Sequence, residues 1–126
     1  MAHSSGQEPG MTMYRDANRW MFEQYAYLVK RLAAETDQGG TMLDNTIVLY
    51  ADTLSDGGGH QVRRLPWVMA GNANGFFKTG RHVKLSADTA PNGVFAAIAE
   101  AVGASVPGAG FGDPKFGLSA YAPVRG

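Results

Sequence analysis

Apolar residues recur every three or four positions along residues 12–35, which predicts a long amphipathic helix. The apolar stripe consists of Met13, Ala17, Trp20, Met21, Tyr25, Leu28 and Leu32. Most charged residues of this stretch fall outside the stripe, so we expect the stripe to pack on a sheet. Thr12 is the expected N-cap, and Gly39-Gly40 marks the end of the segment.

Two shorter apolar runs predict strands. Residues 46–51 are apolar or β-branched without alternation, which indicates a strand that is covered on both faces. Residues 65–71 form the second run, and Pro66 suits a strand start or an edge because it lacks an amide donor. The link between the two runs has no helical periodicity, so we expect an antiparallel or edge placement for the second strand.

The rest of the chain adds little to the sheet. Residues 76–85 predict a short hairpin around Thr79-Gly80, and residues 90–102 predict a second helix. Its expected buried stripe is Val94, Phe95, Ile98, Ala101 and Val102. We therefore predict an α/β fold with a partial mixed sheet flanked by helices over residues 12–104. A flexible N-terminus (1–11) and a Gly/Pro-rich tail (105–126) frame it.

Composition narrows the classes of function. The formal net charge is zero and basic residues form no cluster, so no nucleic-acid partner is expected. No apolar run reaches the roughly 20 residues of a membrane helix, and the polar residues 1–10 do not read as a signal peptide. Cysteine is absent, which excludes disulfides and thiol chemistry.

The stretch that follows the first strand carries the candidate chemistry. Asp52, Asp56 and His60 lie just past its carboxyl end, where ligands bind in open α/β sheets. Carboxylates and an imidazole suit a divalent metal. The alternative is that both carboxylates cap loop amides and that His60 is a solvated loop residue. Three consecutive glycines, 57–59, lack the spacing and the Lys-Ser/Thr ending of a phosphate-binding loop, so a nucleotide site is not expected.

Several motifs resemble one family. They are Asn18-Arg19-Trp20, Glu23 to Leu28, Thr41 to Tyr50, Ser55-Asp56-Gly57, His60, Leu65-Pro66, Ala70-Gly71, Lys78 to His82 and Phe111-Gly112-Asp113. Together they resemble the C-terminal part of a family of mostly exported bacterial proteins that is catalogued only as a domain of unknown function. That family in turn resembles the alkaline phosphatase and sulfatase superfamily. The resemblance implies an alkaline-phosphatase-like C-terminal portion of an α/β domain and an exported or periplasmic protein.

The superfamily resemblance gives the candidate residues roles. Ala51-Asp52 matches the first two positions of an Ala-Asp-His metal motif, whereas Thr53 stands where the His belongs. The resemblance implies Asp52 and His60 as metal ligands, with Asp56 and His3 as further ligands or supporting groups. The implied metal is divalent, zinc or calcium. Arg63, Arg64 and His82 are the candidate substrate-binding residues, and the implied substrate is a small anionic ester.

Two functions follow from these observations. One is the C-terminal portion of a metal-dependent phosphatase- or sulfatase-like hydrolase. This portion is not catalytically complete by itself, because the superfamily's nucleophile region has no counterpart here. The other is a degenerate, non-catalytic binding or structural subunit. Two strands are too few for a strand that is apolar all round, so the partner would be the missing N-terminal part of the domain or another chain that completes the sheet.

Overall fold

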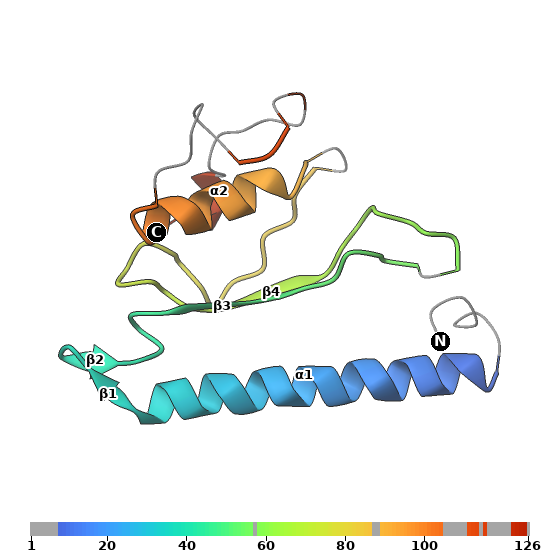
Figure 1. The fold of residues 1–126 in the computed structure, drawn as a ribbon, viewed down its shortest axis with the longest axis horizontal. Helices are drawn as coiled ribbons and strands as arrows, with labels where there is room; N and C mark the ends of the chain where they lie inside the picture. Colours follow the sequence, from blue (N-terminus) through green and yellow to red (C-terminus); the bar gives the residue numbers. More distant parts are fainter. Residues whose placement is uncertain are drawn as a thin grey trace.

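Helices and a small strand pair form three layers in the computed structural model (Figure 1), which describes residues 8–56, 58–86, 89–104, 111–113, 115 and 122–125. The elements in chain order are α1 (Gly10–Ala34), β1 (Thr36–Asp37), β2 (Gly40–Thr41), β3 (Ile47–Ala51), β4 (Trp67–Gly71), α2 (Asn92–Ala101) and the 3₁₀ helix η4 (Ala122–Val124). The β3–β4 pair lies between α1 on one side and α2 on the other (Figure 1). This arrangement is that of an α/β fold.

Helix α1 confirms the long amphipathic helix and corrects its start. It begins at Gly10, where the Met13 N–H donates to the Pro9 carbonyl at 3.1 Å. Thr12 therefore lies inside the first turn rather than at the N-cap, and its hydroxyl donates to Glu8 at 2.7 Å. The helix ends at Ala34.

The segment after α1 forms a small hairpin that the sequence pattern did not predict. β1 and β2 pair antiparallel, with Thr36 opposite Thr41. The two turn residues, Gln38 and Gly39, both have positive φ (45° and 87°), as two-residue hairpin turns require. The sequence indicated only that Gly39-Gly40 ends the helical segment. Gly39 is in addition the second residue of this turn.

β3 and β4 pair antiparallel, as predicted, with Val48 opposite Ala70 and Tyr50 opposite Val68. Directly opposed residues share a face of the sheet, and successive residues alternate between faces. The Tyr50 ring contacts Phe22 and Tyr25 of α1, at centroid distances of 5.3 and 5.7 Å. This face of the sheet is therefore covered by α1.

The opposite face of the sheet meets α2. The Trp67 ring lies 5.3 Å from the ring of Phe95. Around α2 the buried hydrophobic residues of the described part are Phe77, Val94, Ala96 and Ala97. Because Ala96 and Ala97 have small side chains, α2 can lie close to its neighbours. The prediction that Val102 is buried is wrong: α2 ends at Ala101, and the Val102 side chain is 66% exposed.

The predicted burial of the α1 stripe is also wrong. No residue of α1 is buried, and Trp20 is 62% exposed. A helix of 25 residues is about 38 Å long, whereas a five-residue strand spans about 17 Å. Two such strands offer too little surface to cover the helix. The predicted stripe exists, but most of it has no sheet to pack on.

The predicted hairpin over residues 76–85 is wrong as well. Phe77 forms an isolated antiparallel bridge with Arg125 instead. The Arg81 side chain donates to the carbonyl oxygens of Pro123 and Arg125, at 2.7 and 2.9 Å. Residues 122–125 thus take the place that the second hairpin strand was expected to fill.

The described strands do not form the mixed sheet that we expected, because both pairings are antiparallel. Each of the two sheets has only two strands. The shortage of strands that the sequence indicated is therefore present in the structure. In the described residues, no helix has the length and hydropathy needed to cross a membrane.

Candidate functional site

The chain between β3 and β4 folds back on itself as an extended arm (Figure 1). Asp56 forms a bridge with Gln61, and the Gln61 N–H donates to the Asp56 carbonyl at 3.1 Å. The Ser55 N–H donates to the Gln61 carbonyl at 2.8 Å. The loop that carries most of the predicted site residues is therefore a hairpin-like extension of the strand pair.

The Asp56 carboxylate faces the amides of its own loop. Its two oxygens accept from the N–H groups of Gly58 and Gly59, at 3.0 and 3.1 Å. A Cβ on Gly59 would lie 2.7 Å from the Asp56 carboxylate. Glycine is therefore required at position 59, because a side chain there would displace the Asp56 carboxylate and break its hydrogen bonds to the N–H groups of Gly58 and Gly59. This geometry is the loop-capping alternative that the sequence left open.

Asp52 lies directly after β3 and is half-buried. One carboxylate oxygen accepts from the Leu54 N–H at 3.2 Å. Its backbone carbonyl accepts from the indole N–H of Trp67 at 2.8 Å. The indole therefore fixes the chain at the point where β3 passes into the loop.

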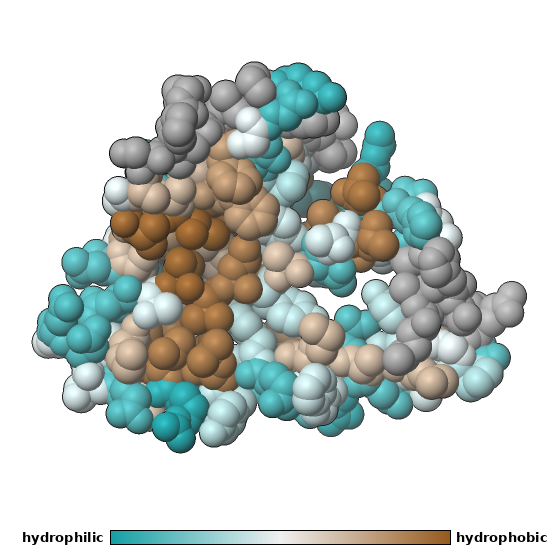
Figure 2. Space-filling view, viewed as in Figure 1, coloured by the Kyte–Doolittle hydropathy of each residue, from teal (hydrophilic) through white to brown (hydrophobic). Residues whose placement is uncertain are grey.

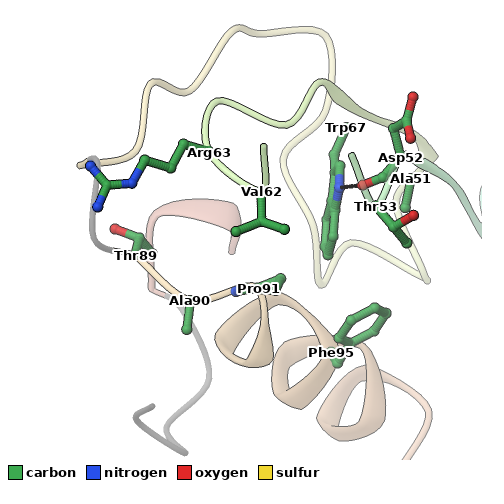
Figure 3. A pocket seen from close by; sticks show the side chains of 10 residues that line it. All are labelled: Ala51, Asp52, Thr53, Val62, Arg63, Trp67, Thr89, Ala90, Pro91 and Phe95. Atoms are coloured by element: carbon green, nitrogen blue, oxygen red, sulfur yellow. Dashed lines mark hydrogen bonds between the residues drawn. The ribbon is translucent and has the colours of Figure 1, made fainter. Parts of the chain in front are cut away.

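A pocket of about 480 Å³ opens beside this point (Figure 3). Its lining comes from the end of β3, the loop, β4 and the start of α2: Ala51, Asp52, Thr53, Val62, Arg63, Trp67, Thr89, Ala90, Pro91 and Phe95. The volume lies within the range of small-molecule sites, and the lining is mostly apolar. Asp52 and Arg63 are its two charged lining residues, and Figure 3 shows them at opposite ends with Trp67 between them.

The structure brings together only some of the predicted site residues. Asp52 and Arg63 line the pocket, and so does Thr53, which replaces the expected metal-binding His. Asp56, His60, Arg64 and His82 are exposed and do not line it. His3 lies outside the described residues.

The described residues do not fit the implied metal. Among them, no group of three or more His, Asp or Glu side chains comes close enough together to hold an ion. Both carboxylate oxygens of Asp56, and one of Asp52, accept hydrogen bonds from backbone N–H groups of the loop. A metal at Asp52 would therefore need ligands from outside this part of the chain.

The sequence did not indicate the aromatic wall of the pocket. Trp67 reads as an ordinary strand residue, and Phe95 reads as part of the buried stripe of α2. Both rings reach the pocket because β4 and α2 meet at the end of β3, which is a long-range contact. The one local signal is the Leu-Pro-Trp run, in which a large amphipathic ring stands at the start of a strand.

Comparison with protein-family models, curated proteins and solved structures finds no match to this chain.

Proposed function

We propose that this chain is a non-catalytic binding or structural subunit that completes its sheet with a partner chain. The observation that carries the proposal is the open edge of β3. β3 is covered by α1 on one face, and its partner β4 meets α2 on the other. Covered faces are typical of a central strand. Yet in the described part of the chain β3 has only one neighbour, β4.

Tyr25 shows which backbone groups face the open edge. Its hydroxyl lies 3.3 Å from the Val48 carbonyl oxygen and 3.4 Å from the Val68 carbonyl oxygen. One hydroxyl can reach both only if both carbonyls point into the space between the strands. In an antiparallel ladder successive residues alternate. The N–H and C=O groups of Leu49 therefore point outward, whereas those of Tyr50 point to β4.

Nothing in the described residues pairs with this edge. No hydrogen bond from a described loop or side chain reaches the backbone of Leu49. β3 also lacks the devices that normally protect an edge: Ile47–Ala51 contains no proline, glycine or charge. The other edge is less suited to pairing, since Pro66 precedes β4 and Gly71 ends it with a φ of 87°.

A strand peptide tests the proposal directly. The probe is a synthetic peptide with the sequence of residues 45–53, added to the isotope-labelled full chain. We expect chemical-shift changes at Ile47, Leu49 and Ala51 as an added strand occupies the edge. The control is the same peptide N-methylated at the positions of Val48 and Leu49, which removes one donor from each of its edges. Absence of binding by the unmethylated peptide, or equal binding by both peptides, would contradict the proposal.

The pocket favours a second candidate, the C-terminal portion of a metal-dependent phosphatase- or sulfatase-like hydrolase. It lies at the carboxyl end of β3 and brings Asp52 and Arg63 to one cavity. A guanidinium there would bind the anionic group of a small ester. The family resemblance supports this candidate, whereas Thr53 in the place of the metal-binding His weighs against it.

Metal titration tests the second candidate. A ligand that binds only the folded chain raises its melting temperature by mass action. The measurement compares zinc, calcium, magnesium and manganese on the parent, on Asp52→Ala and on His60→Ala. The hydrolase candidate predicts that one metal stabilises the parent and neither variant. If no metal shifts the parent, or all three proteins respond equally, these residues are not metal ligands.

A further inference from the structure

The exposed apolar side of α1 continues the open edge of β3. Exposed apolar residues on this side of the helix, here called the α1 lateral stripe, are Met13 (53% exposed), Trp20 (62%), Met21 (53%), Tyr27 (61%) and Leu28 (46%). Met13, Trp20 and Tyr27 are spaced seven residues apart, so they form a row along the helix. Met21 follows Trp20 and Leu28 follows Tyr27 in the sequence. Both therefore lie on the helix between that row and the sheet-facing Tyr25.

The position of α1 places the stripe beside the β3 edge. The aromatic contacts of α1 to the sheet are to Tyr50 of β3, whereas Val68 of β4 stays 38% exposed on the same face. The Tyr25 hydroxyl nevertheless reaches the carbonyl oxygens of both Val48 and Val68, so the helix lies under the boundary between β3 and β4, toward β3. The right-handed turn of α1 directs Met21 and Leu28 away from β4. Figure 2 shows apolar side chains in a continuous column on one face, from the layer of α2 across the sheet to α1.

We infer that this surface, the outer edge of β3 together with the α1 lateral stripe, binds a second copy of the chain. The inference rests on the proposed function and names the partner. A two-fold axis perpendicular to the sheet would pair β3 antiparallel with its counterpart and give one four-stranded sheet. The same axis keeps both α1 helices on one face of that sheet. Met21 and Leu28 then lie at the centre of the contact between the two helices, and the row of Met13, Trp20 and Tyr27 lies at its border away from the sheet. One operation thus covers the strand edge and the helix stripe together.

The exposed area is large enough for such an interface. The accessible surface of the chain is 8682 Å². A compact monomer of its mass, 13.4 kDa, would expose about 6,500 Å². Stable complexes bury roughly 800 Å² on each partner. Helix α1 shows the same feature, since none of its 25 residues is buried.

The charge of the chain also fits self-association. The formal net charge is zero, so two copies meet without long-range repulsion. Arg15 and Arg19 extend from the side of α1 away from Met21 and Leu28, whereas Glu23, three residues after Trp20 and four before Tyr27, borders the stripe. The Arg19–Glu23 pair is exposed. A strongly charged partner would find no complementary field on the stripe itself. An identical apolar stripe is complementary to it.

Sedimentation equilibrium of the full chain over a wide concentration range tests the inference. We expect a reversible dimer for the parent, and at least about a 30-fold rise in the dimer dissociation constant for Trp20→Glu. Met21→Glu is a second variant expected to act in the same way. Both side chains are more than half exposed, so the protomer should keep its helical circular dichroism. The matched control is Arg19→Gln, which makes the same change in charge one residue away on the other side of α1 and should dimerise like the parent.

The outcomes separate this inference from the proposed function. If the parent stays monomeric at every concentration yet binds the strand peptide, the second-copy inference fails and the open-edge proposal stands. If the parent is monomeric and does not bind the peptide, both fail. If the parent dimerises but Trp20→Glu and Met21→Glu dimerise equally well, or if Arg19→Gln is as impaired as they are, the α1 lateral stripe is not the interface.

Discussion

Gly71 offers a sharp test of the packing at the end of β4. Its φ is 87°, in the region that L-residues with side chains rarely adopt. A Cβ at this position would lie 2.7 Å from the Leu43 carbonyl oxygen and closer still to the carbonyl oxygen of Thr46. Both obstacles are backbone atoms that lead into β3, so they cannot rotate away. Gly71 therefore permits the connector before β3 to approach the end of β4.

Gly75 is a matched control, because it shares the positive φ of Gly71 but not its close contacts. Its φ is 85°, and a Cβ there would meet no atom within 4 Å. Gly75→Ala should therefore cost only the left-handed backbone conformation, about 1–2 kcal/mol. Gly71→Ala carries the same term plus a backbone clash, which adds about 1–3 kcal/mol. We expect Gly71→Ala to lower the free energy of unfolding by about 2–5 kcal/mol in total, a large share of the stability of a small domain.

Chemical denaturation followed by circular dichroism measures both variants. The protein concentration must be the same throughout, because self-association adds to the apparent stability. We expect the midpoint of Gly71→Ala to fall well below that of Gly75→Ala, or Gly71→Ala to be unfolded in buffer. Equal losses in the two variants would refute the close approach of residues 43–46 to Gly71.

Three further substitutions test single contacts. Tyr25→Phe removes the hydroxyl that reaches both strands and should cost about 0.5–1.5 kcal/mol, whereas Tyr27→Phe, which is 61% exposed in the parent, should change the free energy of unfolding little. Trp67→Phe should cost about 1 kcal/mol in the same assay, because the Asp52 carbonyl loses its indole donor. Hydrogen bonds to the Asp44 carboxylate, first of all from a backbone N–H of its own turn, lower its pKa in the folded state. Ionised Asp44 should therefore stabilise the fold above its unfolded pKa, and this contribution should disappear as the pH falls through the folded pKa. Asp44→Asn should lack that pH dependence in unfolding curves, and NMR titration should show the lowered pKa directly.

The sequence predicted the elements whose signal is local. The period of apolar residues gave α1 and α2, and the apolar runs gave β3 and β4 with their antiparallel pairing. The shortage of strands was also readable, because two runs cannot surround a strand that is apolar on both faces. A sheet with too few strands can therefore be recognised from the number of apolar runs in the sequence.

The errors came from contacts between distant residues. The stripe of α1 was expected to be buried, but periodicity shows only that a surface is apolar, not that something covers it. The hairpin over residues 76–85 was wrong because Arg81 and Phe77 find their partners at residues 123–125. The β1–β2 hairpin was missed because its strands have two residues each, too few for any period.

The candidate site was predictable to a similar degree. The position directly after a strand predicted to be covered on both faces pointed to Asp52, and Asp52 does line a pocket. The sequence could not decide between a metal ligand and a capping carboxylate at Asp56, since both need an acidic residue in a glycine-rich loop. The distances to the N–H groups of Gly58 and Gly59 show the capping role there.

Amide hydrogen exchange at β3 tests the open edge most directly. The Tyr50 N–H points to β4 and the Leu49 N–H points outward, so the two neighbours report the two edges of one strand. In dilute protein we expect slow exchange at Tyr50 and fast exchange at Leu49, because exchange follows local protection. When a partner strand occupies the outer edge of β3, hydrogen exchange at the Leu49 amide should slow toward the rate at the Tyr50 amide. Protection of both amides in a monomer would contradict the account, since the edge of β3 would then be closed within a single chain.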